Sequence, residues 1–287
     1  AQEVHFVVAK SERKNSSFQP VWGVQWIKQE NFEFILTASE DGCTRKYQIT
    51  TGPILLECHR LLLQRVEGVA EALPIEHKKT FNEAKRQPQS LCLQQSPANS
   101  ETYYVGTDEG CVHICSTNYS QHSRVMQAHR GGVYAIEFSP FSPKIFLTAG
   151  GDWTIRIWVE NVMEPVLEIS DGFSPYHCAT WSPIHSTIIV SCTKDSVQIW
   201  DLRRKNPKPI STQRFDGKQL TVIKFSPSGN TLAVGDSEGN THVCGLEDFP
   251  FPPHFPYDEL INALMKLNNN KNTPNFIYDG VSAFSHT

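Results

Sequence analysis

Apolar and polar residues alternate along short stretches of the chain, and turn-forming residues separate these stretches. The clearest stretch is Val133–Phe138, which ends in Ser139-Pro140. A second apolar run covers residues 145–148, and a third ends at Trp158 after the turn Gly150-Gly151-Asp152. Alternation with a period of two places side chains on opposite faces of a pleated strand. The pattern therefore predicts three consecutive strands joined by short connections.

The same three-strand pattern occurs five times. The third strand of each copy ends in a bulky or sulfur-containing side chain, at Tyr47, Cys115, Trp158, Trp200 and Cys244. The intervals between these positions are 68, 43, 42 and 44 residues. A period of about 40–45 residues, with three strands and a linking fourth strand, is typical of β-propeller blades. The sequence predicts an all-β propeller with about five recognisable blades that form part of a larger ring.

Acidic-glycine pairs lie at equivalent turns of three copies, at Asp41-Gly42, Glu109-Gly110 and Glu238-Gly239. Glycine is favoured there because a tight hairpin needs a positive φ angle.

The repeat also predicts the domain boundaries. The first interval is longer than the others, and its surplus lies between Thr50 and Ser90. The expected organisation has a leftover or closing strand around Val4–Val8 within residues 1–19, a propeller over 20–247 with an insertion at about 51–89, a C-terminal segment over 248–267 with a short helix at Tyr257–Leu267, and a disordered tail over 268–287. The absence of a leader and the number of blades suggest a C-terminal fragment or a short isoform.

Composition narrows the function classes. The 287 residues include 26 Lys plus Arg and 30 Asp plus Glu, for a net charge of -4. This balance gives no electrostatic reason to expect direct nucleic-acid binding. The apolar runs are far shorter than the roughly 20 residues of a membrane-spanning helix. We therefore expect neither nucleic acid nor membrane as a partner.

Catalytic and metal sites are also not expected. The eight cysteines contain no CxxC pair, and most lie in strand-like runs, which favours reduced thiols over zinc ligands. His113 and His242 occupy the same position of their repeats, so we interpret them as repeat residues. No nucleophile elbow or phosphate-binding loop is present. The sequence predicts a protein without catalytic residues, metal or cofactor.

The repeats resemble the WD-repeat family. That resemblance assigns a structural tetrad to the best-preserved copy: His129 before the first strand, Thr148 in the second, Asp152 in the turn and Trp158 in the third. The family's tetrad is a hydrogen-bond network that holds a blade rigid. The other four copies depart from it, since none has a His at the position of His129 and Tyr47, Cys115 and Cys244 replace the Trp in three of them.

Within that family, residues 90–246 resemble axonemal dynein intermediate chains, with the inner-arm type favoured. The resemblance is carried by the hairpin Val105–Gly110, the pair Ala128-His129 and the turn Asp152-Trp153-Thr154, in that order. It implies a scaffold without enzymatic activity whose propeller binds the tail of a dynein heavy chain. It also implies association with other dynein intermediate and light chains on the cytoskeleton of the ciliary or flagellar axoneme.

Three further residues are candidates for partner binding. Trp153 follows the turn Asp and should lie at one rim of the propeller, where it either anchors a partner or packs on a neighbouring loop. Arg203 and Arg204 are candidates for contacts with acidic partners, and solvated surface charges are the alternative interpretation. Trp200-Asp201-Leu202-Arg203 also matches the WD-x-Arg pattern of substrate receptors of cullin ubiquitin ligases, which is the alternative function.

The expected insertion is basic around Thr80-Phe81-Asn82, with Lys78, Lys79, Lys85 and Arg86. Such a loop either touches an acidic microtubule surface or is simply solvated.

Overall fold

The computed structural model describes residues 10–11, 19–29, 32–49, 54–65, 87–172, 174–204, 208–247 and 251–268. Their secondary structure is almost entirely β, with one helix, α1. The chain divides into two compact units, residues 1–127 and 128–287, and each unit is described by itself.

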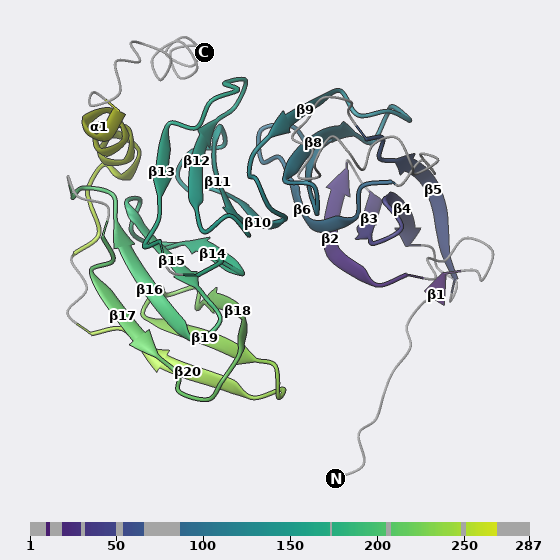
Figure 1. The fold of residues 1–287 in the computed structure, drawn as a ribbon. Coiled ribbons are helices and arrows are strands. Elements are labelled where there is room, and N and C mark those ends of the chain that lie inside the picture. Colours follow the sequence, from purple (N-terminus) through teal and green to yellow (C-terminus); the bar gives the residue numbers. More distant parts are fainter. Residues whose placement is uncertain are drawn as a thin grey trace, which may run out of the picture. The chain divides into compact units, whose positions relative to one another are not determined.

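The first unit contains two sheets (Figure 1). The first sheet is an antiparallel meander of β2 (Val21–Gln29), β3 (Phe32–Ser39), β4 (Cys43–Ile49) and β5 (Ile54–Leu62). A short strand, β1 (Lys10–Ser11), pairs with β5 in parallel orientation. The second sheet consists of β6 (Ser90–Gln95), β7 (Thr102–Thr107), β8 (Cys111–Ser116) and β9 (Arg124–Gln127).

The second unit contains three sheets and the helix. The third sheet consists of β10 (Val133–Phe138), β11 (Ile145–Gly150), β12 (Ile155–Val159) and β13 (Leu167–Ile169). The fourth consists of β14 (Cys178–Trp181), β15 (Ile188–Cys192), β16 (Ser196–Asp201) and β17 (Ser211–Arg214). The fifth has the three strands β18 (Leu220–Phe225), β19 (Thr231–Asp236) and β20 (Thr241–Gly245).

The five sheets confirm the predicted fold class, because each predicted repeat forms one sheet. The repeat-end residues lie in the third strand of their sheets, at Tyr47 in β4, Cys115 in β8, Trp158 in β12, Trp200 in β16 and Cys244 in β20. The described residues therefore form part of a β-propeller built from meander blades.

Alternation within the strands produces the core between neighbouring sheets. Along β19 only every second side chain is buried, including Leu232 and Val234. These two pack with Ile223 against Val190 and Cys192 of the fourth sheet. One sheet cannot cover both of its own faces, so stacking is what removes this apolar surface from water.

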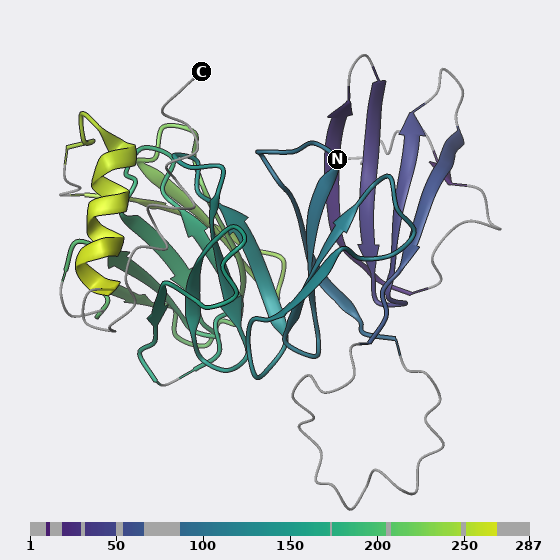
Figure 2. The same cartoon turned by 90° about the horizontal axis from the view of Figure 1, so that it is seen from above.

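Helix α1 (Pro256–Asn268) packs against one side of the second unit, beside β13 (Figures 1 and 2). Proline suits the first helical position, and Asp258 and Glu259 in the first turn complement the helix dipole. The buried residues Leu260 and Leu264 join the core formed by the third and fourth sheets. The helix lies over the stretch 257–267, where apolar spacing predicts one.

Three segments bear on the expected domain boundaries. The stretch 51–89, expected to be an insertion, contains β5 as the fourth strand of the first sheet. Lys10 and Ser11 pair with this first sheet rather than with the last one. Val4–Val8, the basic residues 78–86 and the tail 269–287 lie outside the described residues.

Candidate functional site

The third sheet brings the four expected tetrad residues together. His129 Nδ1 lies 2.8 Å from Asp152 Oδ1, and His129 Nε2 lies 2.7 Å from Thr148 Oγ1. Trp158 Nε1–H donates to the same Thr148 oxygen at 2.9 Å. Thr148 can accept from Trp158 and donate to His129 only if His129 carries its proton on Nδ1. The bonds thus link the loop before β10, strand β11, the β11–β12 turn and strand β12 of one blade.

Burial governs the charges of this network. His129 and Thr148 are fully buried. Burial lowers the pKa of His129 against the opposing effect of Asp152, which favours the neutral ring. Burial alone would raise the pKa of Asp152, but hydrogen bonds from His129, the Arg130 N–H and Thr154 hold it well below its usual range. A neutral imidazole beside a carboxylate that accepts several hydrogen bonds indicates a structural role for this network.

Gly150 makes the position of the His129 ring possible. A Cβ atom at residue 150 would lie 2.4 Å from two atoms of the ring. No side chain fits at that distance, so the residue before the turn must be glycine.

Three of the other sheets use different bonds at the corresponding strands. In the fourth sheet, Trp200 Nε1–H donates to Ser191 Oγ at 2.8 Å. In the first, Arg45 pairs with Asp41 at 2.6 Å, and in the fifth His242 lies 3.0 Å from Asp236. In these three sheets, different polar residues therefore tie the third strand to the second strand or to the turn before it.

Trp153 lies in the β11–β12 turn and is 48% exposed. Its φ angle is +67°, in the left-handed region that bulky side chains rarely adopt. Its carbonyl oxygen accepts a hydrogen bond from Ser170 Oγ at 2.6 Å. The turn is held through the backbone while the indole is presented to solvent.

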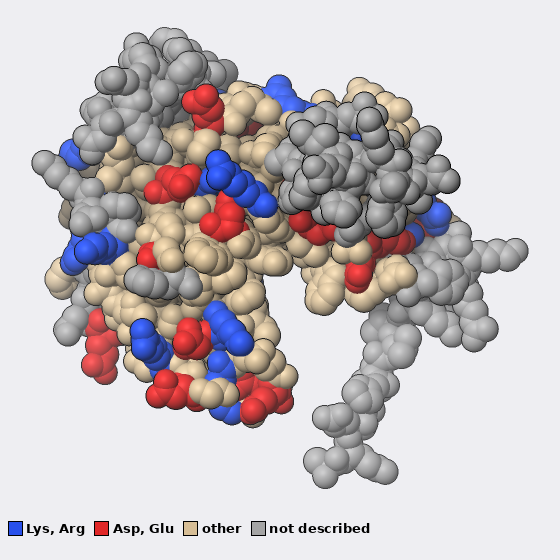
Figure 3. Space-filling model, viewed as in Figure 1, with Lys and Arg blue, Asp and Glu red and all other residues tan. Residues whose placement is uncertain are grey.

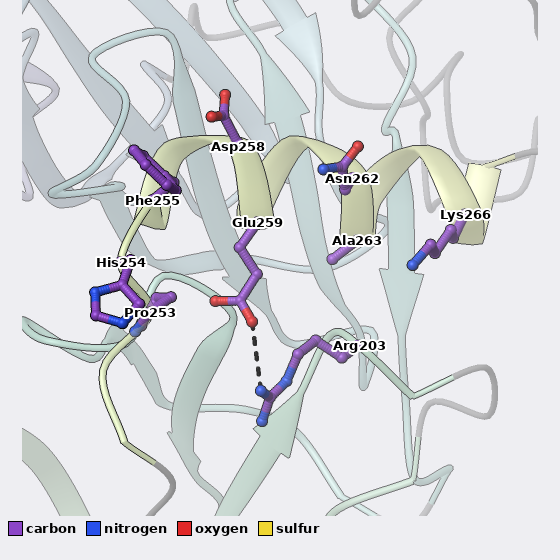
Figure 4. Close-up of a pocket in the computed structure, with 9 residues that line it drawn as sticks. All are labelled: Arg203, Pro253, His254, Phe255, Asp258, Glu259, Asn262, Ala263 and Lys266. Carbon is purple, nitrogen blue, oxygen red and sulfur yellow. Dashed lines mark hydrogen bonds and ion pairs between the residues drawn. The ribbon is translucent and has the colours of Figure 1, made fainter.

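Arg203 contacts α1. Its guanidinium forms a two-pronged pair with Asp201, at 3.0 and 2.8 Å, and lies 3.4 Å from Glu259 (Figure 4). Arg203 and Glu259 border an open pocket of about 470 Å³, which Phe255 and Lys266 also line. Arg203 is thus engaged within its own chain, and this geometry lends the ligase hypothesis no support. Arg204 is exposed at the same end of the sheet.

Trp153 and the two arginines lie at opposite ends of the strands. The Tyr176 N–H donates to Gly150 O, and the His177 N–H donates to Cys192 O. The β11–β12 turn and the Cys192 end of β15 therefore lie at the same end of the two sheets. Arg203 follows Asp201, which pairs with Ile188 at the other end of β15. One small ligand cannot contact both candidates.

Sequence reasoning missed Glu137. This carboxylate on β10 accepts hydrogen bonds from Thr180 Oγ1 at 3.0 Å and from the Trp181 N–H at 3.4 Å, both on β14. Burial raises its pKa. Glu137 joins two neighbouring sheets, and only their pairing in space reveals it.

The described surface shows mixed charge. Acidic and basic side chains lie interspersed on the face of the second unit shown in Figure 3, without an extended basic patch there. Within the described ranges, no helix has the length and apolarity needed to cross a membrane, and no three metal-ligating side chains gather. All eight cysteines are free thiols, of which Cys58 is exposed.

Comparisons with known proteins agree with this geometry. A family model described as the WD40 domain of dynein axonemal intermediate chain 3 matches residues 65–246. Dynein axonemal intermediate chain 4 of Rattus norvegicus is 30% identical over 270 residues, which cover 90% of this chain and 33% of that protein. The 70 kDa intermediate chain of the flagellar outer arm of Chlamydomonas reinhardtii is 26% identical, covering 79% of this chain and 38% of its own length.

A solved structure shows the same fold. The C-terminal WD40 domain of Sif2 superimposes with a TM-score of 0.58 at 17% sequence identity, covering 79% of this chain and 56% of that one. The chain spans about a third of the length of the rat and human intermediate chains 4 that it matches.

The meander sheets, the His-Thr-Asp-Trp network and this structural likeness define a WD40-repeat protein. The match over residues 65–246 includes every strand from β6 to β20. The chain belongs to the dynein axonemal intermediate chain family. The family members named above are axonemal or flagellar proteins, which indicates that the chain is located in the axoneme.

Proposed function

We propose that the chain is the WD40 part of a scaffold subunit of an axonemal dynein complex and has no catalytic activity. Its propeller binds the tail of a dynein heavy chain, next to other intermediate and light chains, and supports assembly or regulation of ciliary motility. The observation that carries this proposal is the family match over residues 65–246. The inner-arm type stays a prediction.

The chemistry of the described residues supports a scaffold. Both ring nitrogens of His129 are engaged in the blade network, and His113 is buried within β8. The titratable groups with perturbed pKa values in the tetrad thus hold strands together. The exposed candidates, Trp153 and Arg204, lie at the blade ends, where a rigid propeller presents its loops to partners.

The test is affinity purification of the tagged full-length protein from ciliated cells. We expect dynein heavy and light chains in the eluate, and a tagged WD40 domain of another family serves as control. Recovery of cullin ligase subunits without dynein chains would refute the proposal.

Surface variants extend this test. Trp153→Gly and Arg204→Glu change opposite ends of the blades without touching the tetrad. Loss of the heavy chain from one of them identifies the end that binds it.

A further inference from the structure

Trp153 occupies a turn position that glycine holds in three other sheets. The turn between second and third strands lies between paired residues, Ala38 and Thr44 in the first sheet and Ala149 and Ile155 in the third. Its fourth residue is Gly42, Gly110 or Gly239 in the first, second and fifth sheets, with φ angles of +72°, +82° and +86°. The third sheet has Trp153 there at +67°. This backbone favours glycine, so the indole is present against the local preference.

Two more aromatic rings lie near this turn. The Tyr134 ring lies over Gly151, where an added Cβ would be 3.2 Å from a ring carbon. Tyr134 is 40% exposed, and its ring centroid lies 5.7 Å from that of His177. Burial and then the charge of Lys194 lower the pKa of His177, which favours a neutral ring. The end of the third sheet is thus aromatic and partly exposed.

Two exposed cations lie near these rings. Arg130 and Lys194 are exposed, and neither has an ion-pair partner within the described residues. The nearby acids form bonds within the chain, although Glu168 and Asp195 are themselves exposed. Asp152 is bound by the tetrad, Glu168 pairs with Arg156 at 3.1 Å, and Asp195 accepts from Thr193 Oγ1 at 3.4 Å.

We propose that one surface of the third and fourth sheets binds an acidic segment of a partner protein that carries a bulky apolar side chain. This surface, the Trp153 surface, consists of Arg130, Tyr134, Trp153, His177 and Lys194. The apolar side chain packs on the indole, and the flanking carboxylates meet Arg130 and Lys194. The inference rests on the proposed scaffold function and specifies the chemistry of one partner. An aromatic anchor beside two exposed cations without ion-pair partners fits an acidic segment better than a basic or purely apolar one.

The test presents the full chain to a display library of random eight-residue peptides. We expect selected peptides to be enriched in Asp and Glu around one Phe, Trp or Leu. The best peptide, measured by fluorescence anisotropy, should bind Trp153→Gly at least tenfold more weakly. Binding should also weaken when its apolar residue is changed to Ala, when its charges are inverted, and in the chain variant Arg130→Glu/Lys194→Glu.

Trp153→Gly also separates anchoring from packing. Because glycine suits the +67° backbone, this variant should melt at the same temperature as the parent or higher. A lower melting temperature would mean that the indole packs within the fold, and the inference would fail. Among the described residues, Asn161 is the other non-glycine residue with positive φ, so Asn161→Gly is the matched control and should leave peptide binding unchanged.

The result is distinguishable from failure of the proposed function. If the full-length protein recovers dynein chains from cells but no acidic peptide is selected, the Trp153 surface is wrong and the scaffold proposal stands. If it recovers no dynein chains, the scaffold proposal fails whichever peptides bind.

Discussion

Replacing Thr148 with valine should destabilise the third sheet more than any other single loss of a hydroxyl in the blades. Valine keeps the shape of threonine but can neither accept the Trp158 N–H nor donate to His129 Nε2. Thr148, Trp158 and His129 are at most 1% exposed, so water cannot replace the lost partners. Each unsatisfied buried group costs about 1–3 kcal/mol. We expect a loss of about 3 kcal/mol, since the added methyl group recovers part of the penalty.

The fourth sheet offers a matched control. Ser191 accepts the Trp200 N–H at 2.8 Å, and no histidine completes that network. Ser191→Ala leaves one indole N–H without a partner and should cost about 2 kcal/mol.

Urea denaturation followed by circular dichroism measures the free energy of unfolding of both variants. Hydrogen exchange of the β11 and β12 amides localises the effect to the third sheet. The reasoning would be refuted if Thr148→Val cost no more than Ser191→Ala, or if protection were lost equally in all sheets.

Three further predictions concern the same unit. Since burial holds the pKa of His129 below its ordinary 6.5, the unfolded chain binds the proton first. The free energy of unfolding should therefore decrease as the pH falls below about 6.5. His129→Gln should flatten this part of its pH dependence, and an unchanged pH dependence would contradict a buried neutral ring. Gly150→Ala should cost about 3 kcal/mol in urea denaturation because its Cβ would collide with the His129 ring, and a neutral result would exclude that contact. Arg203→Gln should loosen α1 by less than about 1 kcal/mol, since the guanidinium is partly exposed. Faster hydrogen exchange confined to α1 would report this loss of helix stability. Unchanged exchange would show that the pair with Glu259 does not hold the helix.

The sequence alone predicted the three main strands of each repeat and their order. Alternating side chains and a period near 43 residues predict the meander sheets, because a strand's two faces are encoded in neighbouring residues. The WD-repeat resemblance brought His129, Thr148, Asp152 and Trp158 into one list, and those residues lie within one repeat. Turn glycines such as Gly42 and Gly110 were also visible, and aligning them with Trp153 would have revealed the unusual position of the indole.

Only the tertiary structure decided how the repeats contact one another. The bonds of Glu137 to β14, the engagement of Arg203 by Glu259 and the pairing of Tyr134 with His177 join residues at least 43 positions apart. No local periodicity carries such information, because it depends on which faces meet after the sheets stack. Likewise, β5 could not be told from a loop by the excess length of its repeat, since its strand state comes from pairing with β4. Local patterning therefore specifies each blade, and packing between blades and helix specifies which polar groups are held and which remain available to partners.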